Sequence, residues 1–376
     1  PADLRRFRDY LRALTEHDGP GEPDLSAFAD FSQFPRYGAT FAQNARAVAE
    51  ERAARPPQRG DAPGFERLAV LDVGLNPHQI AFSADGRTAY VAAAGSDQVA
   101  VVDVATRTLA RTIPVRGTPL AAVPLPGGTS LAVTRFGGEE IARYRISDGA
   151  ELGALRTGGA PSLLTPIGEG RFLVSVERTD RVHVFDARTF DLAHTYATGR
   201  RPFPAAATTD GRLAFVPAYD DGTVTVVDLW NDTVVARVEV GERPSGGAVL
   251  PGDLEYAVAV RGEDRIAFVN TASKEVVGSL SEGIGASPFS VVVAPDGRLA
   301  FVNNTASHDV SVIALPEKRV IARLPVGAQP IVMAVHPSGA TLWVSSEGSH
   351  ELTVFRIPER WRAARDGGSP ALPAGV

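Results

Sequence analysis

Four side chains of this sequence are candidate ligands of one metal ion. They are His78, Glu347 and the pair His308 and His350, which stand at equivalent positions of two similar stretches. Three imidazoles and one carboxylate, with an open position for water, would suit Zn²⁺ or another divalent cation. The two paired histidines are also compatible with a turn in which imidazole replaces aspartate as a side-chain cap. The choice depends on whether the fold brings these residues together.

The elements that must position these residues form a repeat. A unit of about 42 residues recurs seven times, with copies opening at Gly74, Gly117, Gly159, Gly199, Gly241, Gly283 and Gly327. The first copy predicts strands at Pro77–Ser83, Thr88–Ala93, Gln98–Val104 and Thr108–Val115, separated by turns rich in Gly and Asp. A four-stranded meander of this length is one blade of a β-propeller and cannot bury both faces alone. The sequence therefore predicts an all-β fold, a seven-bladed β-propeller.

The segments that join the second strand to the third align without a gap in all seven copies. They are Tyr90–Val99, Ala132–Ile141, Leu173–Val182, Phe215–Val224, Ala257–Ile266, Phe301–Val310 and Trp343–Leu352. Phe301-Val302-Asn303-Asn304, a small polar loop and then Val310-Ser311-Val312-Ile313 resemble the YVTN family of β-propeller repeats, over about three-quarters of the chain. That family includes lyase-like, lactonase-like, electron-transfer-associated and plain binding proteins. The resemblance also implies a periplasmic or secreted location, while a cytoplasmic one stays open.

The seventh copy ends at Pro358 without a fourth strand. Residues 65–73 precede the first copy and match the fourth strands Val234–Val240 and Val320–Val326. We expect 65–73 to complete the last blade, so that a strand from near the start of the chain closes the ring and removes two exposed sheet edges. The predicted propeller therefore spans residues 65–361.

The flanking segments differ from the repeats. Residues 1–64 are predicted to form a helical N-terminal extension, because Leu4, Phe7, Leu11 and Leu14 follow helical spacing and Thr40–Arg55 is rich in Ala, Glu and Arg. Within it, Phe28, Phe31 and Phe34 predict a packing face or a groove for a ligand or partner. The extension is thus a candidate for partner binding or self-association. The tail, residues 362–376, is rich in Gly, Pro and Ala and is predicted to be disordered.

In β-propellers, function usually lies at one end of the central channel, where the loops converge. The fifth position of each ten-residue segment faces this end, and we term these seven the rim residues: Ala94, Phe136, Glu177, Tyr219, Arg261, Thr305 and Glu347. The positions after the blade-opening prolines carry His78, Leu120, Ser162, Phe203, Ser245, Phe289 and Ile331. Repeats built only for packing would not need such diversity. We predict ligand contacts at Phe203, Arg261, Phe289 and Arg135, and catalytic roles for Glu177 and Tyr219.

His308 and His350 stand at the eighth position of the same segments. The other copies have Asp97, Glu139, Asp180, Gly222 and Asp264 there, and we term all seven the cap residues. Because blade one adjoins blade seven in a closed ring, His78, His308, His350 and Glu347 are expected in three consecutive blades and on one face. They form the predicted site for a divalent metal ion, while the cap interpretation stays open.

Composition excludes several classes of function. The chain has 376 residues, 37 Gly and 28 Pro, a net charge of −6 and no basic stripe, which argues against nucleic acid as a partner. It has no cysteine, so disulfides and thiolate sites are absent. No apolar run approaches the length of a membrane span, so no transmembrane helix is predicted. The chain opens at Pro1 without a basic-then-apolar leader, which leaves a removed signal peptide or none as alternatives.

Two classes of function remain. The first is a binding or scaffold protein that holds a small molecule or a protein partner at one end of the channel. The second is a metal-dependent lyase or lactonase that acts on a cyclic ester. In it, the metal at His78, His308, His350 and Glu347 would polarise a carbonyl while Glu177 or Tyr219 moves a proton. The sequence favours the first.

Overall fold

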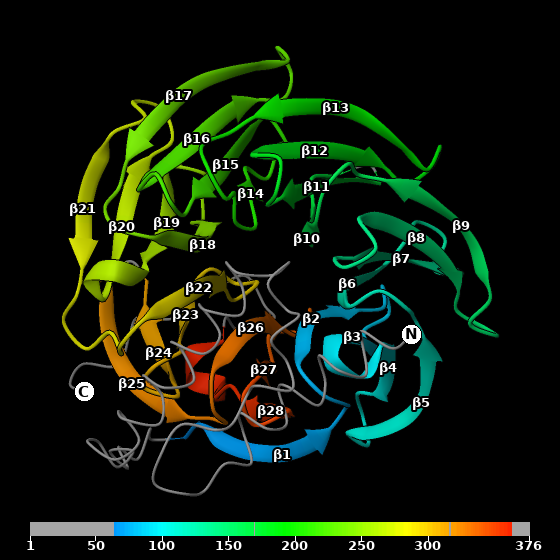
Figure 1. The fold of residues 1–376 in the computed structure, drawn as a ribbon. Helices are drawn as coiled ribbons and strands as arrows, with labels where there is room; N and C mark the ends of the chain where they lie inside the picture. The colour runs from blue at the N-terminus through cyan, green and yellow to red at the C-terminus, as the bar shows by residue number, and fades with distance from the viewer. Residues whose placement is uncertain (1–63, 169, 316, 363–376) are drawn as a thin grey trace, which may run out of the picture. The chain divides into compact units, whose positions relative to one another are not determined.

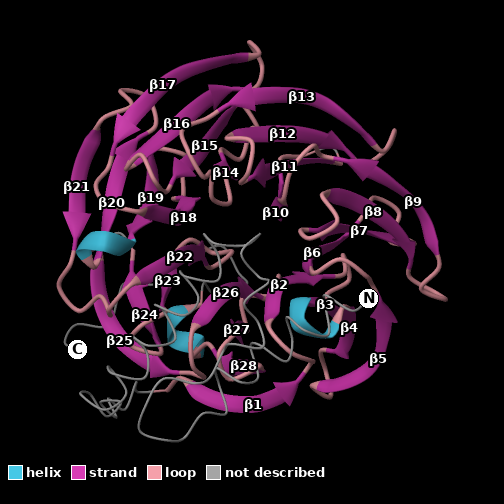
Figure 2. Cartoon of the chain, in the orientation of Figure 1, coloured by secondary structure: helices cyan, strands magenta, loops and turns pink. Residues whose placement is uncertain are grey.

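The computed structural model describes residues 64–168, 170–315 and 317–362. These residues form seven four-stranded antiparallel sheets arranged around one axis (Figure 1). Strands dominate, and the helical elements among the described residues are the short 3₁₀ turns η2 (Ala94–Ser96), η3 (Arg261–Glu263) and η4 (Glu359–Trp361) (Figure 2). The predicted seven-bladed, all-β fold is confirmed.

Each blade runs from an inner strand beside the axis to an outer strand at the periphery (Figure 1). Blades one to three contain β2 (Pro77–Phe82), β3 (Thr88–Ala93), β4 (Gln98–Asp103) and β5 (Thr108–Pro114); β6 (Pro119–Pro124), β7 (Ser130–Arg135), β8 (Glu140–Arg145) and β9 (Glu151–Arg156); and β10 (Pro161–Pro166), β11 (Arg171–Val176), β12 (Arg181–Asp186) and β13 (Asp191–Ala197). Blades four and five contain β14 (Ala206–Ala207), β15 (Leu213–Ala218), β16 (Thr223–Asp228) and β17 (Thr233–Glu239); and β18 (Pro244–Val249), β19 (Glu255–Val260), β20 (Arg265–Asn270) and β21 (Val276–Leu280). Blades six and seven contain β22 (Pro288–Val293), β23 (Leu299–Asn304), β24 (Asp309–Ala314) and β25 (Arg319–Pro325); and β26 (Pro330–Val335), β27 (Thr341–Ser346), β28 (Glu351–Arg356) and β1 (Glu66–Asp72).

The ring closes between β28 and β1. β1 pairs antiparallel with β28 from Glu66–Arg356 to Asp72–Glu351, and it occupies the place that the sequence analysis gave to residues 65–73. Val73, which follows β1, is fully buried in an apolar cluster with Trp343 of blade seven. The two ends of the propeller also meet, since a Cβ on Gly64 would lie 3.2 Å from Pro358 Cγ.

The core of the propeller consists of seven apolar clusters, and each lies between two neighbouring blades. The second and third strands of a blade are buried on both faces, as in β3 and β4, whereas the outer strand β5 is mostly exposed. This explains why the inner segments read as Val, Ala and aromatic runs while the fourth strands carry charges. Each blade buries its faces against its two neighbours.

The inner strands are irregular just after the blade-opening proline. Pairing with the second strand shifts register there, as between Pro288 and Ser290 in blade six. The backbone amide of Ser290 donates instead to Asn303 Oδ1 at 2.8 Å, and the Ser290 hydroxyl lies 2.7 Å from the same oxygen. Asn303 Nδ2 donates to the carbonyl of Pro330 in blade seven at 2.7 Å. One fully buried amide therefore joins two strands of blade six to the next blade.

The two flanking segments of the sequence analysis fall almost wholly outside the described residues. The helical extension over residues 1–64 and the tail over 362–376 therefore stay predictions. In the described part of the chain, the structure has no helix with the length and hydropathy of a membrane span.

Candidate functional site

The same backbone contact positions all seven rim residues. The N–H of each rim residue donates to the carbonyl of the residue that precedes the opening proline of its own blade, as from Tyr219 to Arg201 at 3.1 Å and from Arg261 to Arg243 at 3.2 Å. Arg201 and Arg243 have left-handed backbone, with φ of 55° and 54°. Each rim residue therefore lies next to the residue that precedes the opening proline of its blade. Both are at the same end of the ring, which we term the channel mouth.

Three aromatic rings meet at the channel mouth. Tyr219 stacks on Phe203 with ring centroids 5.1 Å apart and planes inclined by 19°. Phe203 of blade four in turn meets Phe289 of blade six edge to face, at 5.6 Å and 71°. Blade five, which lies between them, carries Ser245-Gly246-Gly247 at the corresponding place. Its small side chains leave the two rings room to meet, and a Cβ on Gly246 would lie 2.9 Å from Ser290 Cβ.

Two guanidinium groups flank these rings. Arg201 lies over Tyr219 at 4.6 Å and over Phe203 at 5.8 Å, and Arg261 lies over Phe289 at 5.6 Å. Such cation–π contacts hold a guanidinium against a ring face. Glu177 joins through Arg201, whose Nε lies 3.9 Å from Glu177 Oε2. We term Glu177, Arg201, Phe203, Tyr219, Arg261 and Phe289 the mouth cluster.

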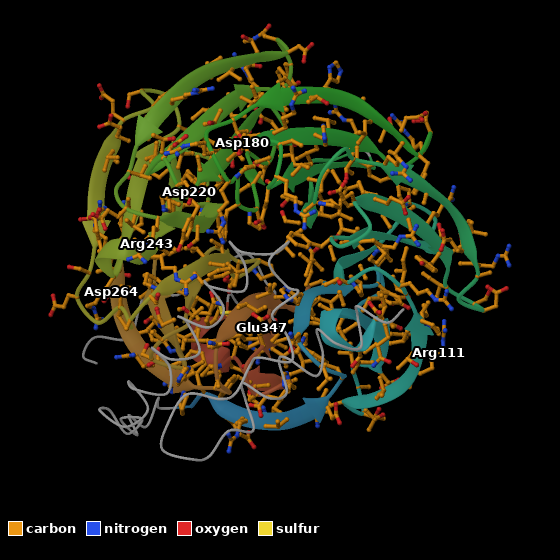
Figure 3. All side chains as sticks on the ribbon, viewed as in Figure 1. Arg111, Asp180, Asp220, Arg243, Asp264 and Glu347 are labelled. Carbon is orange, nitrogen blue, oxygen red and sulfur yellow. The ribbon has the colours of Figure 1, made fainter. Side chains whose placement is uncertain are left out.

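Electrostatics connect Glu347 of blade seven to the mouth cluster. Burial raises the pKa of Glu347 to about 7, although the positive charge of Arg261 opposes that rise. Burial likewise lowers the pKa of Arg261; Arg243 and Arg201 lower it further, while Tyr219 and Glu347 raise it. Figure 3 labels Arg243 and Glu347 among the side chains of the ring. The structure therefore brings five predicted site residues into mutual contact or electrostatic reach, with Glu177 linked through Arg201.

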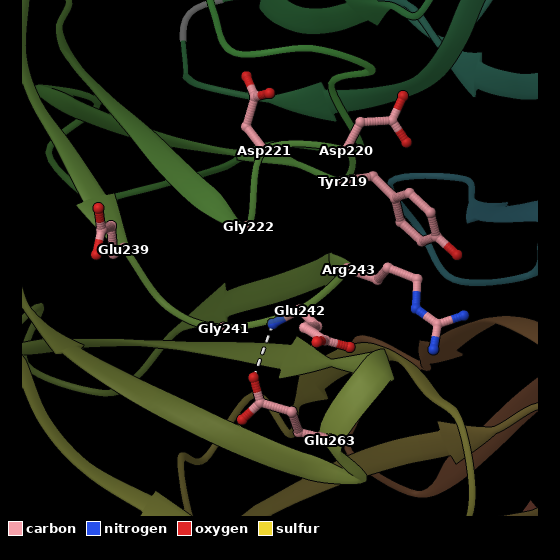
Figure 4. A pocket seen from close by; sticks show the side chains of 9 residues that line it. All are labelled: Tyr219, Asp220, Asp221, Gly222, Glu239, Gly241, Glu242, Arg243 and Glu263. Atoms are coloured by element: carbon pink, nitrogen blue, oxygen red, sulfur yellow. Dashed lines mark hydrogen bonds between the residues drawn. The ribbon is translucent and has the colours of Figure 1, made fainter.

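An open groove of about 550 Å³ adjoins the cluster between blades four and five. Tyr219 and Arg243 belong to its lining, and the other lining residues are mostly acidic: Asp220, Asp221, Gly222, Glu239, Gly241, Glu242 and Glu263 (Figure 4). Asp221 pairs with Arg200 at 2.6 Å and Glu263 with Arg265 at 2.7 Å. Glu263 Oε1 also accepts the amide of Glu242 at 2.8 Å. Asp221 and Glu263 are thus engaged in holding the loops of the groove.

The structure does not bring Arg135 to the other predicted ligand contacts. Its guanidinium lies 2.5 Å from Glu140 Oε2 and 2.9 Å from Glu151 Oε2, and it donates to the Tyr144 hydroxyl at 3.3 Å. All four residues belong to blade two. Arg135 ends β7 one residue before the rim residue Phe136, and side chains of successive strand residues point to opposite faces. Its contacts hold the second, third and fourth strands of blade two together.

His308 and His350 have the geometry of caps. The Nδ1 atom of His350 accepts the amide of Asn76 at 3.3 Å, and that of His308 accepts the amide of Gln329 at 3.1 Å. Aspartates at the same position accept the equivalent amides: Asp97 from Thr118 at 3.0 Å, Asp180 from Arg201 at 2.9 Å and Asp264 from Ser287 at 2.7 Å. These five cap residues thus fasten their blades to the next ones.

The four predicted metal ligands are not gathered into one site. Among the residues that the structure describes, no three His, Asp or Glu side chains are arranged to hold a metal ion. The physical reason is that His308 and His350 direct Nδ1 to backbone amides of their neighbouring blades. His78 lies on β2, where burial lowers its pKa to about 4. Glu347 faces the charge of Arg261 instead.

A pair of variants at His350 tests the cap. His350→Asp is expected to keep the hydrogen bond to Asn76 and to leave the free energy of unfolding nearly unchanged, because three other blades use aspartate here. His350→Ala removes the acceptor and should cost about 1 kcal/mol. Chemical denaturation of both variants measures the difference. Stoichiometric divalent metal in the wild-type protein that is lost in His350→Ala would contradict a purely structural role.

Sequence reasoning missed Arg201 and Arg243. Both directly precede a blade-opening proline, where the other copies carry uncharged residues: Asn76, Thr118, Ala160, Ser287 and Gln329. Two cations at equivalent positions of consecutive blades were a signal in the sequence.

Comparisons with known proteins agree with the fold. No family model matches the sequence. The chain is 30% identical over 181 residues to the seven-bladed beta-propeller protein Rv1057 of Mycobacterium tuberculosis, a match that spans 48% of this chain and 36% of that protein. The structure resembles the Kuenenia stuttgartiensis hydrazine synthase, with a TM-score of 0.67 and 18% identity over 75% of this chain and 96% of that one. It also resembles a chain of the mitotic checkpoint complex, with a TM-score of 0.69 and 15% identity over 81% of this chain and 95% of that one. Both structural likenesses show the fold alone, and the YVTN assignment stays a prediction. This chain is a seven-bladed β-propeller protein.

Proposed function

We propose that the protein is a binding protein that holds a small molecule at the channel mouth. The observation that supports this is the contact of Phe203, Tyr219 and Phe289, three rings from two blades, with guanidinium groups on either side. Aromatic side chains offer a large apolar surface at low cost in conformational entropy, and together with Arg they are typical of binding sites. Phe203 is buried, so a flat ligand would lie against the more exposed Tyr219 and Phe289.

Packing alone does not account for the composition of the cluster. The positions equivalent to Phe203 and Phe289 in four other blades hold Leu120, Ser162, Ser245 and Ile331, and those blades close equally well. The adjoining groove has a volume of about 550 Å³ and is open to solvent. A ligand on the rings could therefore extend into the groove past Tyr219 and Arg243.

Ligand-observed NMR with a library of flat aromatic and matched aliphatic fragments tests this proposal. Aromatic fragments should bind preferentially, and Tyr219→Ala and Phe289→Ala should each weaken them by roughly tenfold, as expected for a lost stacking contact. Phe136→Ala is the matched control, because Phe136 is the rim residue of blade two and lies outside the mouth cluster. Fragments that bind equally well to wild type and Tyr219→Ala would contradict the proposal.

The lyase or lactonase alternative and the extracytoplasmic location stay predictions. Turnover of a lactone library with added divalent metal would test the first. Fractionation of the native host with an antibody against the protein would test the second.

A further inference from the structure

Three arginines lie within electrostatic reach of one another at the channel mouth. Arg201 of blade four and Arg243 and Arg261 of blade five lie close enough for Arg261 to experience the other two charges. Arg261 is only partly exposed and lies against Phe289 and Ser287. Like charges at short range in a partly desolvated place raise the free energy of the empty site. An opposite charge would relieve that cost.

Among the described residues, carboxylates lie closer to Arg201 than to Arg261. Arg201 Nε lies 3.9 Å from Glu177 Oε2, and Arg201 Nη1 lies 4.0 Å from Asp220 Oδ1. Arg261 donates from Nε to Ser287 Oγ at 2.9 Å, and no carboxylate among the described residues lies within 4 Å of its guanidinium. Its two terminal nitrogens are the donors that bind a carboxylate in bidentate fashion.

We propose that the ligand of the channel mouth is a flat carboxylate, whose anionic group binds Arg261 while its ring system lies on Tyr219 and Phe289. This inference rests on the proposed function and specifies its ligand. Arg261 lies over Phe289, so one rigid molecule with an aromatic body and a carboxylate at its edge can contact both. An uncharged analogue of the same shape would use the rings alone.

Glu347 lies within electrostatic reach of Arg261 and so influences an anion bound there. The positive charge of Arg261, which belongs to η3, acts on the carboxyl group of Glu347. His350 contacts the backbone of Glu347. Burial lowers the pKa values of His350 and of His78 on the adjoining blade, so both imidazoles are neutral near pH 7. Glu347, with a pKa of about 7, is the group that titrates. When protonated it leaves Arg261 to the ligand, and when ionised it opposes an anion, so affinity falls as pH rises through 7.

Calorimetry on the full chain with 2-naphthoate and its neutral analogue 2-naphthamide tests the inference. At pH 6, naphthoate should bind roughly tenfold or more tightly than naphthamide, the usual advantage of a charge-assisted hydrogen bond. Between pH 6 and pH 8 its affinity should fall by up to about tenfold, while that of naphthamide stays constant. Arg261→Gln should abolish the preference for naphthoate, and Glu347→Gln should keep tight binding at both pH values. Arg319→Gln, the same change on an exposed outer strand, is the control.

The outcomes separate the two proposals. Equal affinity for naphthoate and naphthamide, or a preference that survives in Arg261→Gln, overturns the carboxylate inference and leaves the aromatic binding site in place. Failure of both probes to bind at either pH overturns the proposed function and the inference with it. Circular dichroism melts of each variant show whether lost binding reflects lost folding.

Discussion

Deleting residues 66–72 is expected to abolish cooperative folding of the propeller. These residues form β1, whose antiparallel ladder with β28 closes the ring. The deletion removes about six backbone pairs and the burial of Leu68 and Leu71, a loss on the order of 5 kcal/mol or more. A typical domain has a total stability of only about 5 to 15 kcal/mol. It also exposes the free edge of β28 to other chains. Thermal melts and size-exclusion chromatography would detect both effects.

Two controls make this prediction specific. Deleting residues 363–376, which lie beyond the last blade, should leave the melting temperature nearly unchanged. On the closing segment itself, Val73 is fully buried and Val70 is 48% exposed. Val73→Asp should therefore cost about 3 to 5 kcal/mol, and Val70→Asp less than about 1 kcal/mol. Equal melting temperatures for the two deletions would show that the seam does not hold the ring.

Replacing Asn303 with alanine is expected to destabilise the propeller by about 3 to 5 kcal/mol, equivalent to roughly 10 °C in melting temperature. The side chain is fully buried and makes three hydrogen bonds, to the Ser290 amide, the Ser290 hydroxyl and the Pro330 carbonyl. Alanine would leave these groups without partners between blades six and seven, where water does not replace them. Differential scanning calorimetry measures the loss.

Asn270→Ala provides the matched control for Asn303. Asn270 accepts the amides of Ala272 and Ser273 in an exposed turn, so water can replace its side chain. Its loss should cost about 1 kcal/mol or less. A smaller effect for Asn303→Ala than for Asn270→Ala would show that the buried amide does not link the blades.

The architecture was predictable because each blade repeats the same physical problem. The period of the glycines and prolines gave the number of blades, and the missing fourth strand after Pro358 pointed to residues 65–73 as its substitute. The register between the first and second strands of a blade was harder to predict from the sequence. The register shift between Pro288 and Ser290 depends on Asn303, which is thirteen residues away in the next strand. No local sequence pattern predicts this shift.

The candidate site was predictable in part. The rim positions identified Glu177, Tyr219, Arg261 and Glu347, because repeats that diverge only at one column indicate a surface under a separate demand. The contact between Phe203 and Phe289 was not predictable, since it depends on the small residues of the intervening blade. The histidines left the metal and cap interpretations open, because imidazole and carboxylate are both metal ligands and acceptors for a backbone amide. Only the position of the Asn76 and Gln329 amides separates the two roles.

Because β1 pairs with β28, the same ring could form from a chain that begins at a different blade. The covalent ends of the propeller are neighbours, with Gly64 beside Pro358 and Arg360. A short peptide could therefore join them, and new termini could be opened at an exposed turn such as Gly127-Gly128. A circularly permuted gene would then encode the same seven sheets with the channel mouth intact. Blade one is first only in the order of the sequence, and any of the seven could serve as first.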